Sequence, residues 1–347
     1  MKRLRSRRGA PGIIEVAQRA GVSPATVSRA YNTPDLVKPD TRKRIEKAAA
    51  DLGYIRDLLA GSLQNRFSGT FGLVVPTIDN AIFAELIESF AARLRHHDRT
   101  MLVAAHGYDL QLEVAIVRSL LERRIDGVAL IGFDHNQIPL AMLRDRAVPT
   151  LSIWNYRDAS PLPCVGADNF EAGRLVAEHL LAMGHRDPVL LFPPTEANDR
   201  ARDRLAGAMA AIKAYGIDLP PERLRVAPYD LGRAKAIMLD LCEADLPSAV
   251  ICGNDIIAQG VIYACQAAQL AIPGDLSVVG IGDFRGSAHI EPGLTTVRLP
   301  AQRIGLTAAD ILVEMSQSRA DPEPWQKLVD ITFVERGSTG PPTMGSG

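Results

Sequence analysis

The sequence has no long apolar run and few cysteines. No stretch of about 18 apolar residues occurs, and the basic opening MKRLRSRRGAPG has no apolar segment behind it. These absences argue against a membrane span and a secretory signal, so we expect a cytoplasmic protein. The four cysteines form no CxxC pair and lie in or near apolar segments, as buried, reduced thiols do. They are Cys164, Cys242, Cys252 and Cys265.

Sequence motifs typical of enzymes are also missing. GxSxG, HExxH, P-loop and metal-ligand spacings do not occur, and the seven histidines are scattered. The nearest candidate for a dinucleotide loop, GIGDFRG at 280–286, has the wrong spacing and lies late in the chain without an opening βαβ unit. We therefore predict a protein that is not an enzyme and that needs no cofactor and no metal.

Charge is distributed unevenly along the chain, although the net charge is only -1. Residues 1–65 contain 13 Lys or Arg and 6 Asp or Glu, whereas the remaining 282 residues contain 26 and 34. A small basic head on a larger acidic body is typical of a phosphate-binding domain attached to a domain that DNA repels. A solvated basic tail is the alternative, but the head stays positive when the first eight residues are removed.

The segment at 13–32, IIEVAQRAGVSPATVSRAYN, predicts two short helices that bury one shared face. Gly21 lies where the first helix must end, because glycine accepts the left-handed conformation of a helix C-cap. Ser23 and Pro24 then predict a helix start, with serine as N-cap and proline at the first helical position. The pattern is that of a helix-turn-helix.

The second helix of such a unit can enter the major groove of DNA. Arg29 is its one long donor, able to bond guanine or a phosphate, whereas Pro24 and Ala25 offer only apolar contacts. Direct readout should therefore be sparse, with DNA deformation supplying part of the specificity. The candidate DNA-binding residues on this helix are Ser23, Pro24, Ala25, Thr26, Ser28, Arg29 and Asn32.

A third helix is predicted from the segment KPDTRKRIEKAAADLGY at 38–54, with Pro39 near its start and Gly53 beyond its end. Ile45 and Leu52 share one face of this helix. Three short helices complete a small all-α domain, for which we predict the boundaries 1–56.

From Thr70 onward, short apolar runs alternate with helical stretches, which predicts parallel sheets with helices on both faces. Asp168 and Glu171 look like a capping pair that opens the second half of this α/β body. Ligands of such sheets bind beyond the carboxyl ends of the strands.

Several segments, in this order, resemble the lactose/galactose repressor family of bacterial transcriptional regulators over nearly the whole chain. They are EVAQRAGVSPATVSRAYN, TRKRIEKAAADLGYI, GLVVPTIDN, DGVALIG, RLAG, GND, SVVGIGDF and LTTVRLPAQRIG. The resemblance implies a helix-turn-helix headpiece and a two-lobed body like a periplasmic sugar-binding protein, with three crossings between the lobes. We expect a hinge at 57–69 and a body at 70–340, with lobe one about 70–160 plus part of 291–340 and lobe two about 161–290.

The resemblance also implies a hinge that folds into a helix on operator DNA. It places Leu63 as a wedge in the minor groove and Ala60 on the hinge-helix face; an apolar wedge unstacks and bends the duplex. The segment DLLAGSLQN is too short to be helical alone, as a conditional helix requires. The chain departs from the family pattern in having Gly12 for a capping Thr, Arg56 for a proline, and Gly61 within the hinge.

Candidate effector-binding residues lie after the predicted strands. Aromatic rings can stack on a sugar ring, and Arg, Asn or Asp can bond its hydroxyls. The candidates are Phe83, Trp154, Arg204, Tyr229, Asn254 and Asp283. The resemblance implies effector contacts for Arg204, Tyr229 and Asn254, whereas Phe83 and Trp154 fit a core position equally well.

Gly282 stands where many members of the family have the first of two acidic residues. Loss of that carboxylate while Arg204 remains favours an anionic effector, such as a sugar acid related to gluconate. Two headpieces are needed to read a palindromic site, so we expect a homodimer, and the sequence leaves a tetramer open.

The resulting interpretation is a nucleoid-associated transcriptional repressor that binds operator DNA and is controlled by a small carbohydrate. The alternatives are a solute-binding-protein-like sensor, or an activator or corepressor-dependent regulator of another metabolite. The missing signal peptide and the headpiece disfavour the first.

Overall fold

A computed structural model describes residues 11–55, 67–318 and 325–343. The chain divides into two compact units, 1–68 and 69–347. Among the described residues, no helix combines the length and the apolarity that crossing a membrane requires.

The first unit is a three-helix domain, as the sequence predicts. Its elements are α1 (Ile13–Ala20), α2 (Pro24–Asn32), the 3-10 helix η1 (Pro34–Leu36) and α3 (Pro39–Leu52). Gly21 and Gly53 end α1 and α3 in the left-handed conformation, with φ of 67° and 65°. The hydroxyl of Ser23 caps α2 by accepting a bond from the Thr26 amide at 3.2 Å.

A small apolar core holds the three helices together. Each helix contributes one face, and the most buried side chains are Val16, Ala17, Val27 and Ile45. At the N-terminus of α1, the Glu15 carboxylate accepts a bond from the Gly12 amide at 2.9 Å, so the helix start keeps one side-chain partner although Gly12 has no hydroxyl. The residues of the predicted hinge at 57–66, including Ala60 and Leu63, lie outside the described residues.

The second unit contains two six-stranded sheets. The first has the order β11-β5-β4-β3-β1-β2 and is parallel throughout; the second has the order β12-β10-β9-β8-β6-β7 and is parallel except for the β10–β12 pair. The strands of the first sheet are β1 (Thr70–Val75), β2 (Thr100–Ala105), β3 (Gly127–Ile131), β4 (Thr150–Asn155), β5 (Cys164–Ala167) and β11 (Gln326–Leu328). Those of the second are β6 (Val189–Phe192), β7 (Leu224–Val226), β8 (Ala249–Cys252), β9 (Ser277–Gly282), β10 (Thr295–Arg298) and β12 (Thr332–Val334).

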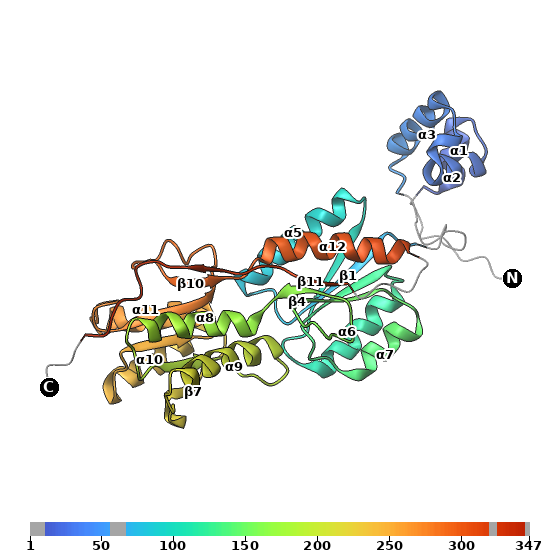
Figure 1. Cartoon of the computed structure of the whole chain (residues 1–347). Helices are drawn as coiled ribbons and strands as arrows, with labels where there is room; N and C mark the ends of the chain where they lie inside the picture. The colour runs from blue at the N-terminus through green and yellow to red at the C-terminus, as the bar shows by residue number, and fades with distance from the viewer. Residues whose placement is uncertain (1–10, 56–66, 319–324, 344–347) are drawn as a thin grey trace. The chain divides into compact units, whose positions relative to one another are not determined.

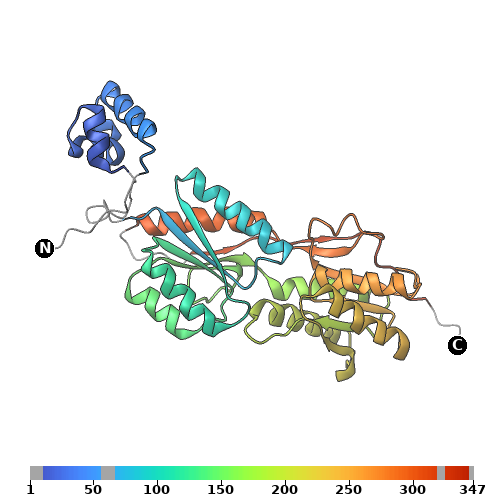
Figure 2. The same ribbon diagram turned by 180° about the vertical axis from the view of Figure 1, so that it is seen from behind.

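Helices cover both faces of each sheet (Figures 1 and 2). We call the first sheet with its helices lobe one; its helices are α5 (Ala81–His96), α6 (Leu110–Glu122), α7 (Gln137–Asp145) and α12 (Ala301–Gln317). Lobe two is the second sheet with α8 (Asn169–Ala182), α9 (Asp199–Ala214), α10 (Leu231–Ala244), α11 (Asp255–Ala267) and the 3-10 helix η2 (Pro221–Arg223). Alternate residues of β8 face opposite helix layers: Ile251 packs in the cluster of α8 and α9, and Val250 in that of α10 and α11.

The arrangement confirms the predicted fold class of a helical headpiece and an α/β two-lobed body. The chain passes between the sheets three times: after β5, after β10 and between β11 and β12. The first two crossings were expected near 160 and 290. The structure has them several residues later, because the chain stays in the first sheet through β5, which ends at Ala167, and in the second sheet through β10, which ends at Arg298.

Candidate functional site

The exposed face of α2 carries most of the predicted DNA-binding residues. Pro24, Ala25 and Arg29 are exposed, while Val27 and Ala30 on the opposite face are buried in the headpiece core. Within residues 11–55, no carboxylate forms an ion pair with Arg29. The side chain is therefore available to a partner outside the domain.

Local hydrogen bonds order the other polar residues of this helix. The hydroxyl of Ser23, besides capping the helix, lies 2.9 Å from that of Thr26, and the amide nitrogen of Asn32 donates to the Ser28 hydroxyl at 3.1 Å. Ser23 thus has a structural role in the helix start, whereas Thr26, Ser28 and Asn32 are ordered on or beside the exposed face.

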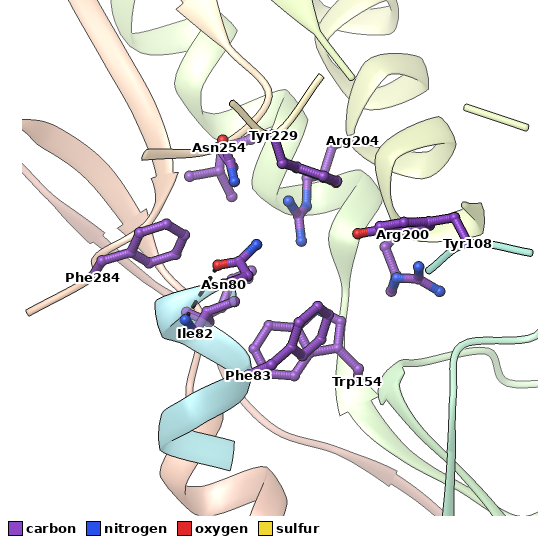
Figure 3. A pocket seen from close by; sticks show the side chains of 12 residues that line it. Asn80, Ile82, Phe83, Tyr108, Trp154, Arg200, Arg204, Tyr229, Asn254 and Phe284 are labelled. Atoms are coloured by element: carbon purple, nitrogen blue, oxygen red, sulfur yellow. Dashed lines mark hydrogen bonds between the residues drawn. The ribbon is translucent and has the colours of Figure 1, made fainter. Parts of the chain in front are cut away.

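A pocket in the second unit lies between the lobes (Figure 3). The space inside it that a water-sized sphere can enter is about 20 Å³, room for about one water molecule, so the lobes lie close together around these side chains. Five of the six effector-binding candidates line it. The lining residues are Asn80, Ile82, Phe83, Tyr108, Trp154, Arg200, Arg204, Tyr229, Asn254, Ile281, Phe284 and Leu299.

An aromatic wall from lobe one forms one side of the pocket. Phe83 near the start of α5 and Trp154 in β4 lie with their ring centroids 5.4 Å apart at an interplanar angle of 59°. Both side chains are buried, and both line the pocket. Each residue is therefore part of the core and part of the pocket wall at once. Rings of this kind can stack on the apolar face of a ligand.

A second aromatic pair crosses from one lobe to the other. Tyr108, after β2, stacks on Tyr229, after β7, with the ring centroids 6.0 Å apart at 25°. The Tyr229 hydroxyl accepts a hydrogen bond from the Asn198 side chain at 3.2 Å. Burial raises the pKa of the Tyr108 hydroxyl, so it remains a neutral donor at physiological pH.

Arg204 is a buried cation that no carboxylate of the described residues contacts directly, although the charge of Asp255 acts on it from a greater distance. Its Nε donates to the side-chain oxygen of Asn169 at 2.7 Å and one terminal nitrogen donates to the Gly253 carbonyl at 3.0 Å. No ion pair between described residues includes Arg204. Burial lowers the pKa of Arg204, which is the expected effect of removing a charge from water.

Arg200, one helical turn earlier on α9, differs because Asp199 compensates its charge. The Asp199 carboxylate accepts from Arg200 at 2.6 Å, from the Phe133 amide at 3.0 Å and from the Asn155 side chain at 2.8 Å. Phe133 and Asn155 belong to lobe one, so Asp199 links the lobes beside the pocket. A side chain at Gly132 would not fit there, since a Cβ would lie 2.2 Å from Arg200.

Asp283 is the candidate that the structure does not bring to the pocket. Its carboxylate accepts from Arg298 at 2.6 Å and from Arg336 at 2.7 Å, so two cations occupy it. Gly282 and Asp283 have positive φ angles, 141° and 55°, and this turn leads to Phe284, which lines the pocket instead. A Cβ at Gly282 would lie 2.3 Å from the Phe284 ring, so this backbone and ring position excludes any side chain there.

The sequence prediction did not include Asn80, Tyr108, Arg200 or Phe284. The rule that ligands bind beyond the carboxyl ends of strands could have found Asn80 and Tyr108, which follow β1 and β2. Arg200 lies four residues before Arg204 on the same helix, which places it on the same face. Phe284 had no such signal, because its position depends on the turn at Gly282.

Comparisons with known proteins agree with this description. The family model "Bacterial regulatory proteins, lacI family" matches residues 12–57, and a periplasmic binding protein-like domain matches residues 177–339. The HTH-type transcriptional repressor PurR of Erwinia tasmaniensis is 30% identical over 329 residues, which cover 94% of this chain and 96% of that protein.

Two solved structures extend the likeness to the whole fold. The lac repressor dimer bound to operator and the anti-inducer ONPF has a TM-score of 0.83 at 26% identity, covering 96% of this chain and all of that chain. A complex of the transcriptional regulator CelR with cellobiose has a TM-score of 0.69 at 25% identity, covering 94% and 99%.

Proposed function

We propose that this chain, which belongs to the LacI family of bacterial regulatory proteins, responds to a small anionic carbohydrate, a sugar acid such as a gluconate derivative. It is a DNA-binding transcriptional repressor controlled by a small-molecule effector, and it is not an enzyme. It acts as a homodimer on operator DNA, in the cytoplasm on the nucleoid. Pairing of dimers into a tetramer is a further option for the assembly.

The observation that carries the anionic effector is that Arg204 is buried and forms no ion pair with any described carboxylate. The pocket is lined by two guanidinium groups and by no carboxylate among the described residues, and only Arg200 has an acidic partner. A buried charge is stable when it is paired and hydrogen-bonded. A ligand carboxylate supplies that pairing, with the planar geometry that a guanidinium favours.

The rest of the pocket supports a carbohydrate. Phe83 and Trp154 offer ring faces to the C–H side of a sugar chain, and Asn254 offers a donor to its oxygens. The similar regulator CelR is in complex with cellobiose, so the fold accepts carbohydrates.

For the operator, we propose that α2 lies in the major groove and that Arg29 is its main base-reading side chain. Pro24, Ala25, Thr26, Ser28 and Asn32 supply apolar and polar contacts around it, and Ser23 fixes the helix start that presents them. The sites in the hinge, Ala60 and Leu63, are proposed from the family resemblance only. We keep the proposed domain boundaries of headpiece 1–56, hinge 57–69 and body 70–340, with the lobe crossings moved as described above.

A matched pair of ligands tests the anionic effector. Thermal unfolding and isothermal titration of the full chain are measured with hexonates and with the hexitols of the same configuration, which lack only the carboxylate. We expect at least one hexonate to bind and to raise the unfolding midpoint, because a ligand of the native state stabilises it by mass action. Stabilisation by hexitols or other neutral sugars, with no effect of any sugar acid, would reject the proposal.

A further inference from the structure

Two asparagines cap helices whose N-termini point to the pocket. The side-chain oxygen of Asn80 accepts a bond from the Ile82 amide at the start of α5, at 3.3 Å, and that of Asn254 accepts from the Ile257 amide at the start of α11, at 3.0 Å. Because each cap occupies the oxygen, the amide nitrogen is the atom left to face the pocket. Figure 3 shows both nitrogens directed into it.

These nitrogens lack acceptors. Asn80 is 5% and Asn254 is 2% exposed, and the amide nitrogen of Asn254 has no hydrogen-bond partner among the described residues. The nitrogen of Asn80 also donates no hydrogen bond within the described part of the chain, but it is not fully enclosed, so of the two only the Asn254 nitrogen is a buried donor without a partner. A buried donor is normally paired, so the Asn254 nitrogen requires an acceptor from outside the protein, and Asn80 offers a second donor to the same pocket.

The electrostatics of this end favour an acceptor that is negative. The N-termini of α5 and α11, helices of 16 and 13 residues, both bring positive partial charge to it. Aspartate caps a helix as well as asparagine does. Capping therefore does not explain why both positions carry an amide, whereas recognition of an acceptor does.

We infer that the Asn80 and Asn254 amides form a second acceptor site in the pocket, and that the effector is a sugar acid with a carboxylate at each end of its carbon chain. One carboxylate pairs with Arg204, and the other accepts hydrogen bonds from the two amides. The hydroxyl groups between them lie against the aromatic rings. This inference rests on the proposed function and narrows the class of its effector from sugar acids to aldaric acids.

The test compares hexarates with hexonates of the same configuration, which differ only in a carboxylate or a hydroxymethyl group at carbon six. Dissociation constants are measured by titration calorimetry on the full chain. We expect the best hexarate to bind at least tenfold more tightly than its hexonate. In Asn254→Asp, which keeps the cap but turns the donor into an acceptor, this preference should fall at least tenfold.

Asn80→Asp turns the donor on the other lobe into an acceptor. It replaces Asn254→Asp in the test if that variant does not fold. Asn136→Asp is the matched control, since Asn136 caps α7 in the same way, through the Ile138 amide at 3.0 Å, and does not line the pocket. Equal binding of hexarate and hexonate, or an unchanged preference in the folded aspartate variants, overturns the second site and leaves the anionic effector standing. Binding of neither acid overturns both.

Discussion

The replacement Arg204→Gln removes the charge that we assign to recognition of the effector. In the absence of effector, the variant loses two hydrogen bonds from a charged donor, to Asn169 and to the Gly253 carbonyl, each worth about 1.5–3 kcal/mol, and is relieved of a desolvated charge that costs several kcal/mol. These terms have opposite signs. The free energy of unfolding without effector should therefore change by less than about 2 kcal/mol.

Effector binding should respond much more strongly. Truncation of one partner of a buried, hydrogen-bonded charge pair costs about 2–5 kcal/mol, and each 1.4 kcal/mol is about tenfold in affinity. We expect the dissociation constant for the sugar acid, measured by titration calorimetry, to rise by roughly 30-fold or more. Arg233→Gln, which removes an exposed arginine from lobe two outside the pocket, should bind like the wild type.

Binding of the acid to Arg204→Gln within threefold of the wild type would refute the assignment. So would an equal loss of affinity in Arg204→Gln and in Arg233→Gln, since that result would point to the net charge of the lobe and not to a contact in the pocket.

Three further predictions concern the headpiece and the effect of pH. Arg29→Ala should weaken operator binding by about 1–3 kcal/mol in fluorescence anisotropy, with effector affinity unchanged; full operator affinity would contradict the placing of α2 in the groove. Ile45→Ala, at a position 1% exposed, should destabilise the headpiece by about 2–5 kcal/mol and abolish operator binding while calorimetry still detects the effector. Burial lowers the pKa of His106 and His185 below the ordinary value of 6.5, so both rings bind fewer protons in the folded chain than in the unfolded one, and stability should fall as the pH drops below 6.5. His106→Gln should lose less stability than the wild type between pH 7.5 and 5.5 in denaturant unfolding; an identical loss would argue against this origin.

The headpiece was predictable because its signals are local. Gly21 and Gly53 end helices in the conformation that glycine favours, and Ser23 with Pro24 begins the next one. Each of these residues determines the backbone of its own immediate neighbours. The two short helices and their turn therefore follow from residues 13–32 read in order.

The short strands of the body were not predictable in this way. β11 has three residues and pairs with β5, more than 150 residues earlier in the chain, and β12 pairs with β10. A strand of three or four residues carries too little alternation to be distinguished from a loop. Its formation depends on a sheet edge that only the folded chain provides.

The residues of the pocket also divide into those with a signal in the sequence and those whose position depends on the folded chain. Tyr229 and Asn254 follow from their place after strands, Arg204 follows from the family resemblance, and all three line the pocket. Asp283 does not, because its carboxylate turns to Arg336, a partner 53 residues away in sequence. The sequence shows that position 282 lacks a carboxylate. It does not show that the Phe284 ring occupies the space beside Gly282.

The most direct test of the account is operator binding by the full chain with and without the acid. Fluorescence anisotropy on the promoter fragment of the chain's own gene, at fixed salt, is measured with the best-binding sugar acid and with its hexitol. We predict that the acid changes the operator dissociation constant at least tenfold, a coupling of about 1.4 kcal/mol, and that the hexitol leaves it unchanged. The same change with both ligands, or no change with any sugar acid, would contradict the account.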